Sequence, residues 1–401
     1  MGTHMNKFEE FRTHVPVLKD RAYLDSASTG LIPDFVYDGV LHYQKERYLV
    51  SGDSTWEIGD VRPHGTLDMM DWAKAALAEM LCCEKQNIIF GQNTSQLYAL
   101  AVASFPFQAG DNVILPENGY TTSRFAWQIL ESKGLEIRYA KADNGVLHPE
   151  AYKALCDERT IALCANYVES ASGFRMNLEA LGEYCHQNDV YLIVDGTQGL
   201  GVMPLDVKKS KVDYIVGDDY KWMMGFCGAG YAYVSERMMN KMDQRMAGWM
   251  SDDDRFNTSK QILALRKDAG RYELGYPTAH GVYAFGLVAK KYIEMGREDI
   301  KNYLFGLCDA LKDELADIPG VELRYDFDEM GRSQIVVVAV DDCICVSNKD
   351  FEEANVVAHF RTSDLPGKRH IRLGIHYYNN LEDIRKFCEV LRSAAKRSAK
   401  Q

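Results

Sequence analysis

Two apolar runs of this chain lead into polar side chains that are common in enzyme sites. The run 190–194 ends at Asp195, with Gln198 three residues later, and the run 214–216 is followed closely by Lys221. A lysine amine attacks carbonyl carbons and moves protons, and a fixed carboxylate stabilises a neighbouring cation. An Asp and a Lys at neighbouring strand ends also form structural ion pairs. The residues alone leave both interpretations open.

Two further segments have the composition of ligand-binding loops. Asn93, Thr94 and Ser95 stand between a predicted strand and a helix that begins near Gln96. The N–H groups and the positive end of a helix favour phosphate, although Ser and Thr are also ordinary helix N-caps. Tyr120 follows another predicted strand and offers an aromatic face, with a place in the core as the alternative.

Short β-rich runs alternate with helical segments, which predicts an α/β fold with a mostly parallel sheet of seven strands. Amphipathic stretches at 67–81 and 177–186 have the spacing of helices. Ligands of such sheets bind beyond the carboxyl ends of the strands, where the residues above lie. The predicted buried strands are 87–90, 112–115, 135–139, 160–165, 190–194, 214–216 and 231–234.

The pattern changes after about residue 255 and predicts a smaller α+β domain. We expect a long helical region over 283–315, strands at 321–325 and 335–340, and a final helix that carries Leu381, Ile384, Phe387 and Leu391. The predicted division is an N-terminal segment (1–15) with a tag remnant at 1–4, a large domain (16–275) and a small domain (276–401).

Composition excludes several classes of function. The chain has 401 residues and a formal net charge of -12, which argues against nucleic acid as a partner. No apolar stretch approaches the roughly 20 residues of a membrane span, so we expect a cytoplasmic protein. The ten cysteines lack the spacing of a disulfide framework or a metal site and are expected to be reduced.

Five motifs, in this order and spacing, resemble the class V aminotransferase and cysteine desulfurase family of pyridoxal-phosphate (PLP) enzymes of fold type I. The resemblance covers nearly the whole chain. The motifs are Leu24-Asp25-Ser26-Ala27-Ser28-Thr29-Gly30, Asn93-Thr94-Ser95, Asp195-Gly196-Thr197-Gln198, Tyr220-Lys221-Trp222 and Arg372-Leu373-Gly374-Ile375-His376-Tyr377-Tyr378-Asn379.

The resemblance implies a role for each cofactor-site residue. Lys221 would form the Schiff base with the cofactor aldehyde and then move the substrate's α-proton, for which it must be neutral, so we expect positive charge nearby. Asp195 would keep the pyridine nitrogen protonated, and Gln198 would lie near the phenolic oxygen. Asn93, Thr94 and Ser95 would bind the phosphate, while Tyr120 and Tyr220 would complete the cofactor site.

The same resemblance implies a substrate site and a partner. Arg372 is the candidate for the α-carboxylate, because its planar fork binds a carboxylate with two hydrogen bonds. The loop with Ser26, Ala27 and Ser28 is expected to close over that carboxylate. Tyr276 or Thr278 would reach the phosphate of a partner subunit, which implies a homodimer with a shared active site. Nearby Lys368 and Arg369 are interpreted as solvated charges.

Two departures from the family pattern bear on the reaction. No cysteine occurs between Val346 and Arg372, so the usual nucleophile for sulfur transfer is missing. Asp218 stands where desulfurases have a phosphate-binding Ser, and we expect this acid to turn away from the site because it would repel the phosphate.

We therefore predict a PLP enzyme that acts on a small α-amino acid, with β-elimination or C–S cleavage as the first hypothesis. Class V transamination, epimerisation and kynureninase-like hydrolysis are the alternatives. A nucleotide-binding or regulatory α/β protein is the non-enzymatic alternative. Its one supporting feature is the glycine run 225–230, which does not open a helix after the first strand.

Overall fold

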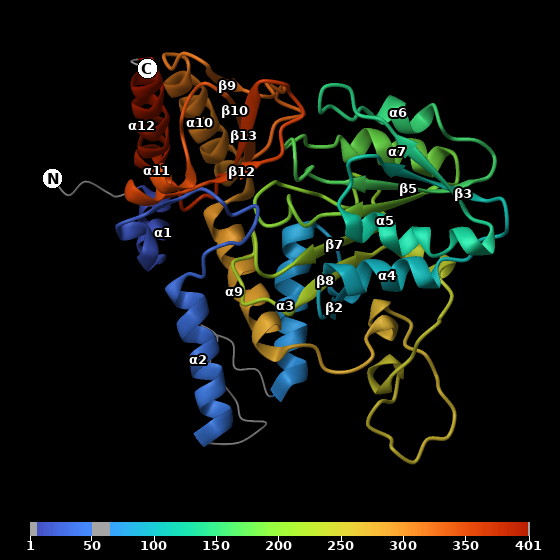
Figure 1. Ribbon diagram of the computed structural model, residues 1–401. Coiled ribbons are helices and arrows are strands. Elements are labelled where there is room, and N and C mark those ends of the chain that lie inside the picture. The colour runs from blue at the N-terminus through green and yellow to red at the C-terminus, as the bar shows by residue number, and fades with distance from the viewer. Residues whose placement is uncertain (1–5, 50–64, 400–401) are drawn as a thin grey trace.

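A seven-stranded sheet forms the centre of the structure, a computed structural model that describes residues 6–49 and 65–399 (Figure 1). The predicted tag remnant at 1–4 lies outside the described residues. Strands β7, β6, β5, β3 and β4 are parallel to one another, whereas β8 runs antiparallel to β7 and β2. The predicted α/β class and mostly parallel sheet are confirmed. In spatial order the strands are β2 (Ile88–Gly91), β8 (Gly230–Val234), β7 (Tyr214–Asp218), β6 (Tyr191–Asp195), β5 (Thr160–Asn166), β3 (Asn112–Pro116) and β4 (Glu136–Ala140).

Alternate side chains of the central strands enter two separate cores. In β6, Leu192 and Val194 belong to the core under α3, α7 and α9, and Ile193 belongs to the core under α4, α5 and α8. Because both faces are covered, these strands are continuous apolar runs. The edge strand β4 differs, since Glu136 is exposed; the prediction that this run is buried is wrong. The covering helices are α3 (Gly65–Leu81), α4 (Thr94–Ser104), α5 (Thr121–Gln128), α6 (Pro149–Lys153), α7 (Leu178–Gln187), α8 (Glu236–Lys241) and α9 (Ala279–Met295).

A second, antiparallel sheet lies beside the first in the order β12-β13-β10-β9 and is covered by α10 and α12 (Figure 1). The predicted helical region 283–315 is confirmed, and it consists of α9 and α10, which are separated at Gly296, where the backbone has a φ of +80°. Strands β12 and β13 were not predicted, because β13 is rich in basic residues and lacks an apolar run. The elements are β9 (Val321–Leu323), β10 (Ile335–Asp341), β12 (His359–Arg361), β13 (Lys368–Gly374), α10 (Arg297–Leu315), α11 (Asn348–Glu353) and α12 (Leu381–Ser398).

The interpretation of Lys368 and Arg369 as solvated charges is wrong. Lys368 pairs with Glu322 and Asp341 at 2.6 and 3.1 Å, and Arg369 donates a hydrogen bond to the Val346 carbonyl. Both side chains therefore fasten β13 to its surroundings.

The N-terminal segment packs against the C-terminal part of the chain. Arg12 of α1 holds Asp383 through two hydrogen bonds of 2.7 and 2.9 Å, and β1 pairs with β11. Since α9 packs against α2 and α3, we propose Gly296 as the domain boundary in place of residue 275. These remaining elements are α1 (Lys7–Thr13), β1 (Ala22–Tyr23), α2 (Asp34–Leu49) and β11 (Val356–Val357).

The described residues provide neither a membrane span nor a metal cluster. No helix among them is both long and apolar enough to cross a bilayer. Within the same residues, no three His, Cys, Asp or Glu side chains gather as a metal ion would require. The ten cysteines carry free thiols.

A buried ion pair joins α3 to the segment before α9. Nζ of Lys74 lies 2.8 Å from Oε2 of Glu273, whose Oε1 accepts the N–H of Phe90 at 2.9 Å. Glu273→Ala leaves a buried ammonium without its partner, so we expect the free energy of unfolding to fall by about 3–5 kcal/mol. Urea denaturation measures this. Asp71→Ala, which breaks an exposed pair on the same helix, should cost less than about 1 kcal/mol, and equal losses would contradict the prediction.

Candidate active site

A cavity of about 940 Å³ lies where the carboxyl ends of the large sheet face the small sheet. One side is formed by residues at or after the ends of β2, β3, β5, β6 and β7, and the other by β12, β13 and the segment after β9. This is the edge at which the sequence predicts a ligand. The predicted site residues that line it are Ala27, Ser28, Asn93, Thr94, Ser95, Tyr120, Asp195, Gln198, Tyr220, Lys221 and Arg372.

Lys221 lies three residues beyond the end of β7. Its Nζ is 3.6 Å from Oδ2 of Asp218 and 5.3 and 6.0 Å from the ring centroids of Tyr220 and Tyr120. Asp218 is buried and lines the cavity, so the expectation that it turns away is wrong. The alternation of β7 explains this, because Val216 faces the core under α4 and Asp218, two residues later, lies on that same face.

The charges around Lys221 are acidic, contrary to the expectation of positive charge. Burial lowers the pKa of Lys221, but Asp218, Tyr220 and Asp195 outweigh burial and raise that pKa above the ordinary value. Burial also raises the pKa of Asp218 to about 7, while Lys221 opposes this shift. At neutral pH the amine of Lys221 therefore holds its proton, and Asp218 is its nearest acidic partner.

Asp195 ends β6, and Gln198 lies in the turn that follows. Oδ1 of Asp195 accepts the N–H of Thr197 at 3.0 Å, which fixes the carboxylate at the cavity wall. Nε2 of Gln198 donates to the Ala27 carbonyl at 3.0 Å, and its Oε1 accepts the indole N–H of Trp222 at 2.9 Å. The amide is thus oriented from both ends, with its donor side toward the loop that contains Ala27.

The N-terminus of α4 opens onto the cavity. Asn93 is the N-cap, and its Oδ1 accepts the N–H of Gln96 at 2.8 Å. The hydroxyl of Thr94 lies 3.2 Å from the hydroxyl of Thr197, and the hydroxyl of Ser95 lies 2.8 Å from the hydroxyl of Thr122. Backbone N–H groups, hydroxyls and the positive helix end together suit a phosphate.

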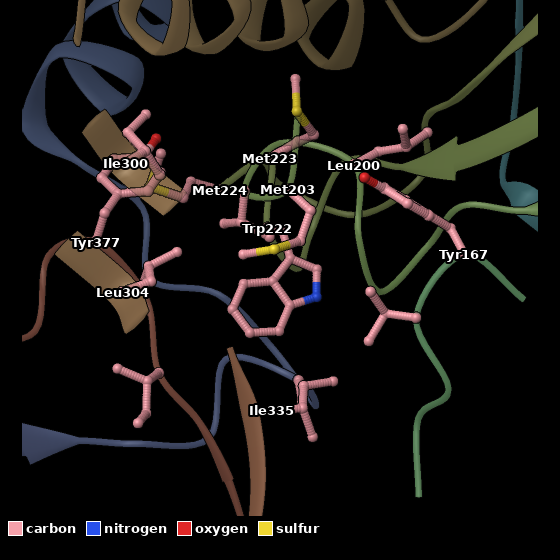
Figure 2. Packing of buried hydrophobic residues seen from close by; sticks show 14 of the residues in the cluster. Tyr167, Leu200, Met203, Trp222, Met223, Met224, Ile300, Leu304, Ile335 and Tyr377 are labelled. Atoms are coloured by element: carbon pink, nitrogen blue, oxygen red, sulfur yellow. The ribbon is translucent and has the colours of Figure 1, made fainter. Parts of the chain in front are cut away.

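Packing from both sheets immobilises the loop of Lys221. Trp222 is fully buried and stacks on His376, with ring centroids 5.6 Å apart and an interplanar angle of 14°. Burial lowers the pKa of His376 to about 3, so the stack stays uncharged at neutral pH. The backbone N–H of Gly30 donates to the Tyr220 carbonyl, and a Cβ at Gly30 would lie 1.8 Å from the Lys221 carbonyl oxygen. Figure 2 shows Trp222 among Leu200, Met203, Met223, Met224 and Ile335.

Arg372 of β13 lines the cavity from the small sheet. One terminal nitrogen donates to the Ser170 carbonyl at 2.9 Å, and the other donates to Oγ of Ser28 at 2.8 Å. Its Nε is buried without a hydrogen-bond partner among the described residues. The guanidinium group is therefore fixed in direction and retains an unused donor.

Ser26 does not join its neighbours at the cavity. Its side chain is buried, and its Oγ lies 2.7 Å from the hydroxyl of Tyr378 in the core. Ala27 and Ser28 do line the cavity, and their role in substrate binding stays a prediction.

Several lining residues were missed by the sequence interpretation. Arg361 of β12 and His370 of β13 are paired across the small sheet, and both line the cavity. Arg324 after β9 and Glu169 after β5 also line it. The sequence does contain a signal for these residues, because basic side chains occupy alternate positions of 359–361 and 368–372. Alternate side chains share one face only in a strand, so the signal requires both segments to be interpreted as strands.

Tyr276 and Thr278 lie outside the cavity lining of their own chain. Oγ1 of Thr278 donates to the Gly228 carbonyl at 2.9 Å, and the ring of Tyr276 packs on Trp249 with centroids 5.0 Å apart. The glycine run 225–230 leads into β8 rather than into a helix, so it lacks the arrangement of a dinucleotide site.

The donor set of the cavity fits pyridoxal phosphate. An amine for the cofactor's aldehyde and a carboxylate for its ring nitrogen line the same cavity. A helix N-terminus for its phosphate and an aromatic ring for the face of its pyridine ring line it as well. Two buried oxygens of the lining residues, Oδ1 of Asn118 and of Asn166, have no hydrogen-bond partner among the described residues.

Comparison with known proteins finds a family model and relatives that span nearly the whole chain. Residues 22–387 match the family model described as Aminotransferase class-V. The chain is similar to a probable cysteine desulfurase of Methanothermobacter thermautotrophicus, with 24% identity over 96% of this chain and 98% of that protein. The fold is similar to apo cysteine desulfurase from Thermococcus onnurineus, with a TM-score of 0.83 and 19% identity over 99% of this chain and 100% of that one.

A second solved structure is similar in fold and holds a reaction product. It is the complex of the cystine C-S lyase C-DES with cysteine persulfide, with a TM-score of 0.80 and 18% identity over 94% of this chain and 99% of that one. A mutant of C-DES, with a TM-score of 0.80 and 18% identity over 95% of this chain and 98% of that one, has glycine covalently linked to its PLP cofactor.

Proposed function

Because the chain belongs to the aminotransferase class-V family of PLP enzymes, we propose that it is a C–S lyase that acts on a small α-amino acid by β-elimination, with Lys221 carrying the cofactor. The supporting observation is a desulfurase-like framework whose cavity lining, among the described residues, contains no cysteine. A lyase needs no sulfur-accepting nucleophile, and C-DES, which has a similar fold, is a cystine C-S lyase.

Each group of the cavity has a defined task in this proposal. Bound PLP supplies an electron sink for the pair left at the substrate's α-carbon. Asp195 holds the proton of the ring nitrogen, and the N-terminus of α4 holds the phosphate. Arg372 orients the α-carboxylate. The neutral form of the Lys221 amine takes the α-proton at Nζ, and Asp218 is placed to share it.

The overall reaction balances without an oxidant or reductant. The Cα–H and Cβ–S bonds break, the α-proton goes to Lys221, and the sulfur leaves with the electron pair of the Cβ–S bond. Water then releases ammonia and a keto acid from the remaining fragment. The protein's contribution is to hold the Cα–H bond within reach of the amine.

Product analysis tests this proposal. Purified holoenzyme is incubated separately with L-cysteine, L-cystine and L-kynurenine, and keto acid, ammonia, alanine and released sulfur compounds are measured. We expect keto acid and ammonia in equal amounts. Keto acid without ammonia or sulfide would show transamination, and a D-amino acid as the product would show epimerisation. Release of alanine from kynurenine would show the kynureninase-like reaction; each of these outcomes contradicts the lyase.

The charge of Asp218 should delay cofactor capture at neutral pH. Only the neutral amine attacks an aldehyde, and Asp218 contributes to the raised pKa of Lys221. Asp218→Asn removes this contribution, so the neutral fraction at a given pH increases. We expect the pH midpoint of the rate of yellow colour formation, on mixing apoenzyme with PLP, to fall by about one pH unit. An unchanged midpoint would contradict the prediction, and Asp189→Asn, at an exposed side chain that precedes β6, is the control.

We also propose that the protein is a homodimer in which Tyr276 or Thr278 reaches the partner's phosphate. Trp249, Phe256 and Tyr276 form a cluster of partly exposed aromatic rings, which favours an interface at this surface. Light scattering measures the mass, and Thr278→Ala should weaken PLP binding if its hydroxyl crosses the interface.

A further inference from the structure

Three of the acidic side chains that line the cavity are buried, and they differ in their partners. They are Glu169, Asp195 and Asp218. Asp218 lies 3.6 Å from Nζ of Lys221, whereas Asp195 and Glu169 form no ion pair among the described residues. A buried carboxylate is costly unless a cation compensates it. In the proposed function the protonated ring nitrogen of PLP compensates Asp195, so Glu169 is the buried acid that still lacks a cation.

A tight turn after β5 fixes the backbone of Glu169 at the cavity wall. The N–H of Glu169 donates to the Phe174 carbonyl at 2.8 Å, and its carbonyl accepts the N–H of Gly173 at 2.9 Å. Gly173 has a φ of +80°, and a Cβ at this position would overlap the carbonyl oxygen of Ile335 in β10. Because strands of both sheets hold this turn, its acid cannot move toward a distant partner.

The two carboxylate oxygens of Glu169 are unequally satisfied. Oε2 accepts the N–H groups of Ala171 and Ser172, each at 2.8 Å. Among the described residues, Oε1 accepts only the hydroxyl of Ser170, at the long distance of 3.5 Å. Burial raises the pKa of Glu169, and the N–H groups of Ser172 and Ala171 oppose this shift. Oε1 is therefore the oxygen that remains available to a ligand.

The arginines of the cavity lining already have acidic partners. Arg324 donates two hydrogen bonds of 3.1 and 2.9 Å to Asp364. Oδ1 of Asp25 lies 3.6 Å from a terminal nitrogen of Arg361 and 3.6 Å from one of Arg372. These guanidinium groups are directed to other acids, so they do not complete the buried carboxylate of the turn.

Glu169 lies next to the site proposed for the substrate's α-carboxylate. Arg372 donates to the carbonyl of Ser170, the residue that follows Glu169, at 2.9 Å. The α-amino group of the substrate is joined to the cofactor in the proposed function, so a cation for Glu169 must come from the side chain. The cavity of about 940 Å³ is at the upper end of the range for small-molecule sites, which leaves room for such a side chain.

We propose that the sulfur-bearing side chain of the substrate carries a cationic group, such as an ammonium, that binds Oε1 of Glu169. This inference rests on the proposed function, because it names the substrate class of that same site. The thiol that leaves when the Cβ–S bond breaks retains the cation. Glu169 is then a specificity-determining residue.

The test compares two substrates of nearly equal size that differ in one terminal group. S-(2-aminoethyl)-L-cysteine ends in an ammonium, and S-propyl-L-cysteine ends in a methyl group. Keto-acid formation by the holoenzyme gives kcat/KM for each. We expect the wild type to prefer the aminoethyl compound at least about tenfold, since a charge-assisted hydrogen bond contributes on this scale. Glu169→Gln can still accept the N–H groups of Ala171 and Ser172, and it should bring the ratio close to one by lowering kcat/KM for the aminoethyl compound alone.

Glu117→Gln separates a direct contact from the overall charge of the cavity. Glu117 lines the same cavity, but it is exposed and accepts the N–H of Ala142. Because solvent screens its charge, the variant should retain the preference. Equal kcat/KM values in the wild type, or equal losses for both substrates in Glu169→Gln, would overturn the inference. Loss of the preference in Glu117→Gln to the same extent as in Glu169→Gln would also overturn it.

The same measurements distinguish failure of the inference from failure of the proposed function. If the wild type cleaves both compounds equally well, only the inference fails. If neither compound yields keto acid and ammonia, the proposed lyase fails. Titration of the cofactor spectrum with both compounds then gives their Kd values, and equal Kd values would overturn the inference as well.

Discussion

Lys221→Ala should lower kcat at least about a thousandfold and abolish covalent attachment of the cofactor. Proton transfer by a positioned side chain contributes about 10²–10⁴ in rate, and this variant also removes the amine that carries PLP. Lys221 is the only lysine among the described residues that line the cavity. No other side-chain amine of the lining can therefore replace it. Borohydride reduction followed by peptide mapping measures attachment, and a keto-acid assay measures kcat.

Lys209→Ala is the matched control. Lys209 lies on the surface, where it pairs with Glu179, and its loss should leave both measurements within about twofold. Full activity in Lys221→Ala, or a borohydride label on another peptide, would remove the basis of the proposed function. A non-catalytic regulatory protein would then be the better interpretation.

Asp195→Asn should lower kcat about 100- to 1000-fold while PLP remains bound. The amide keeps the shape of the carboxylate and can still accept the N–H of Thr197, but it carries no charge to hold a proton on the ring nitrogen. Loss of a single preorganised electrostatic contact in an enzyme site costs this much in kcat. Steady-state kinetics with saturating PLP measures the change.

Asp189→Asn provides the control at the other end of the same strand. Asp189 is exposed, precedes β6 and pairs with Arg237 on the surface. Its substitution should change kcat less than twofold. If both variants lost activity equally, the loss would reflect damage to β6 rather than the charge of Asp195.

The large sheet and its ligand-binding edge were predictable because their signals are local. Buried parallel strands are apolar runs, and the residues after them carry the site, so Asp195, Gln198 and Lys221 could be found without a structure. The small sheet gave no such signal. Its strand β13 places Arg372 on one face and Leu373 on the other, and its basic residues concealed the alternation.

The direction of individual side chains was the part that the sequence left undetermined. We expected Asp218 to point away from a phosphate. Strand alternation instead places its side chain on the same face of β7 as Val216. Ser26 was expected at the substrate, yet Tyr378, 352 residues later in the chain, binds its hydroxyl in the core. Both outcomes depend on tertiary contacts that a motif does not contain.

Trp222 provides an optical probe of the site. An indole shielded from water and adjacent to the lysine would transfer its excitation energy to a yellow chromophore in the cavity. Quenching of its emission would then report cofactor binding in real time, without substrate. Comparison with a Trp222→Phe protein would isolate this signal from that of the other tryptophans.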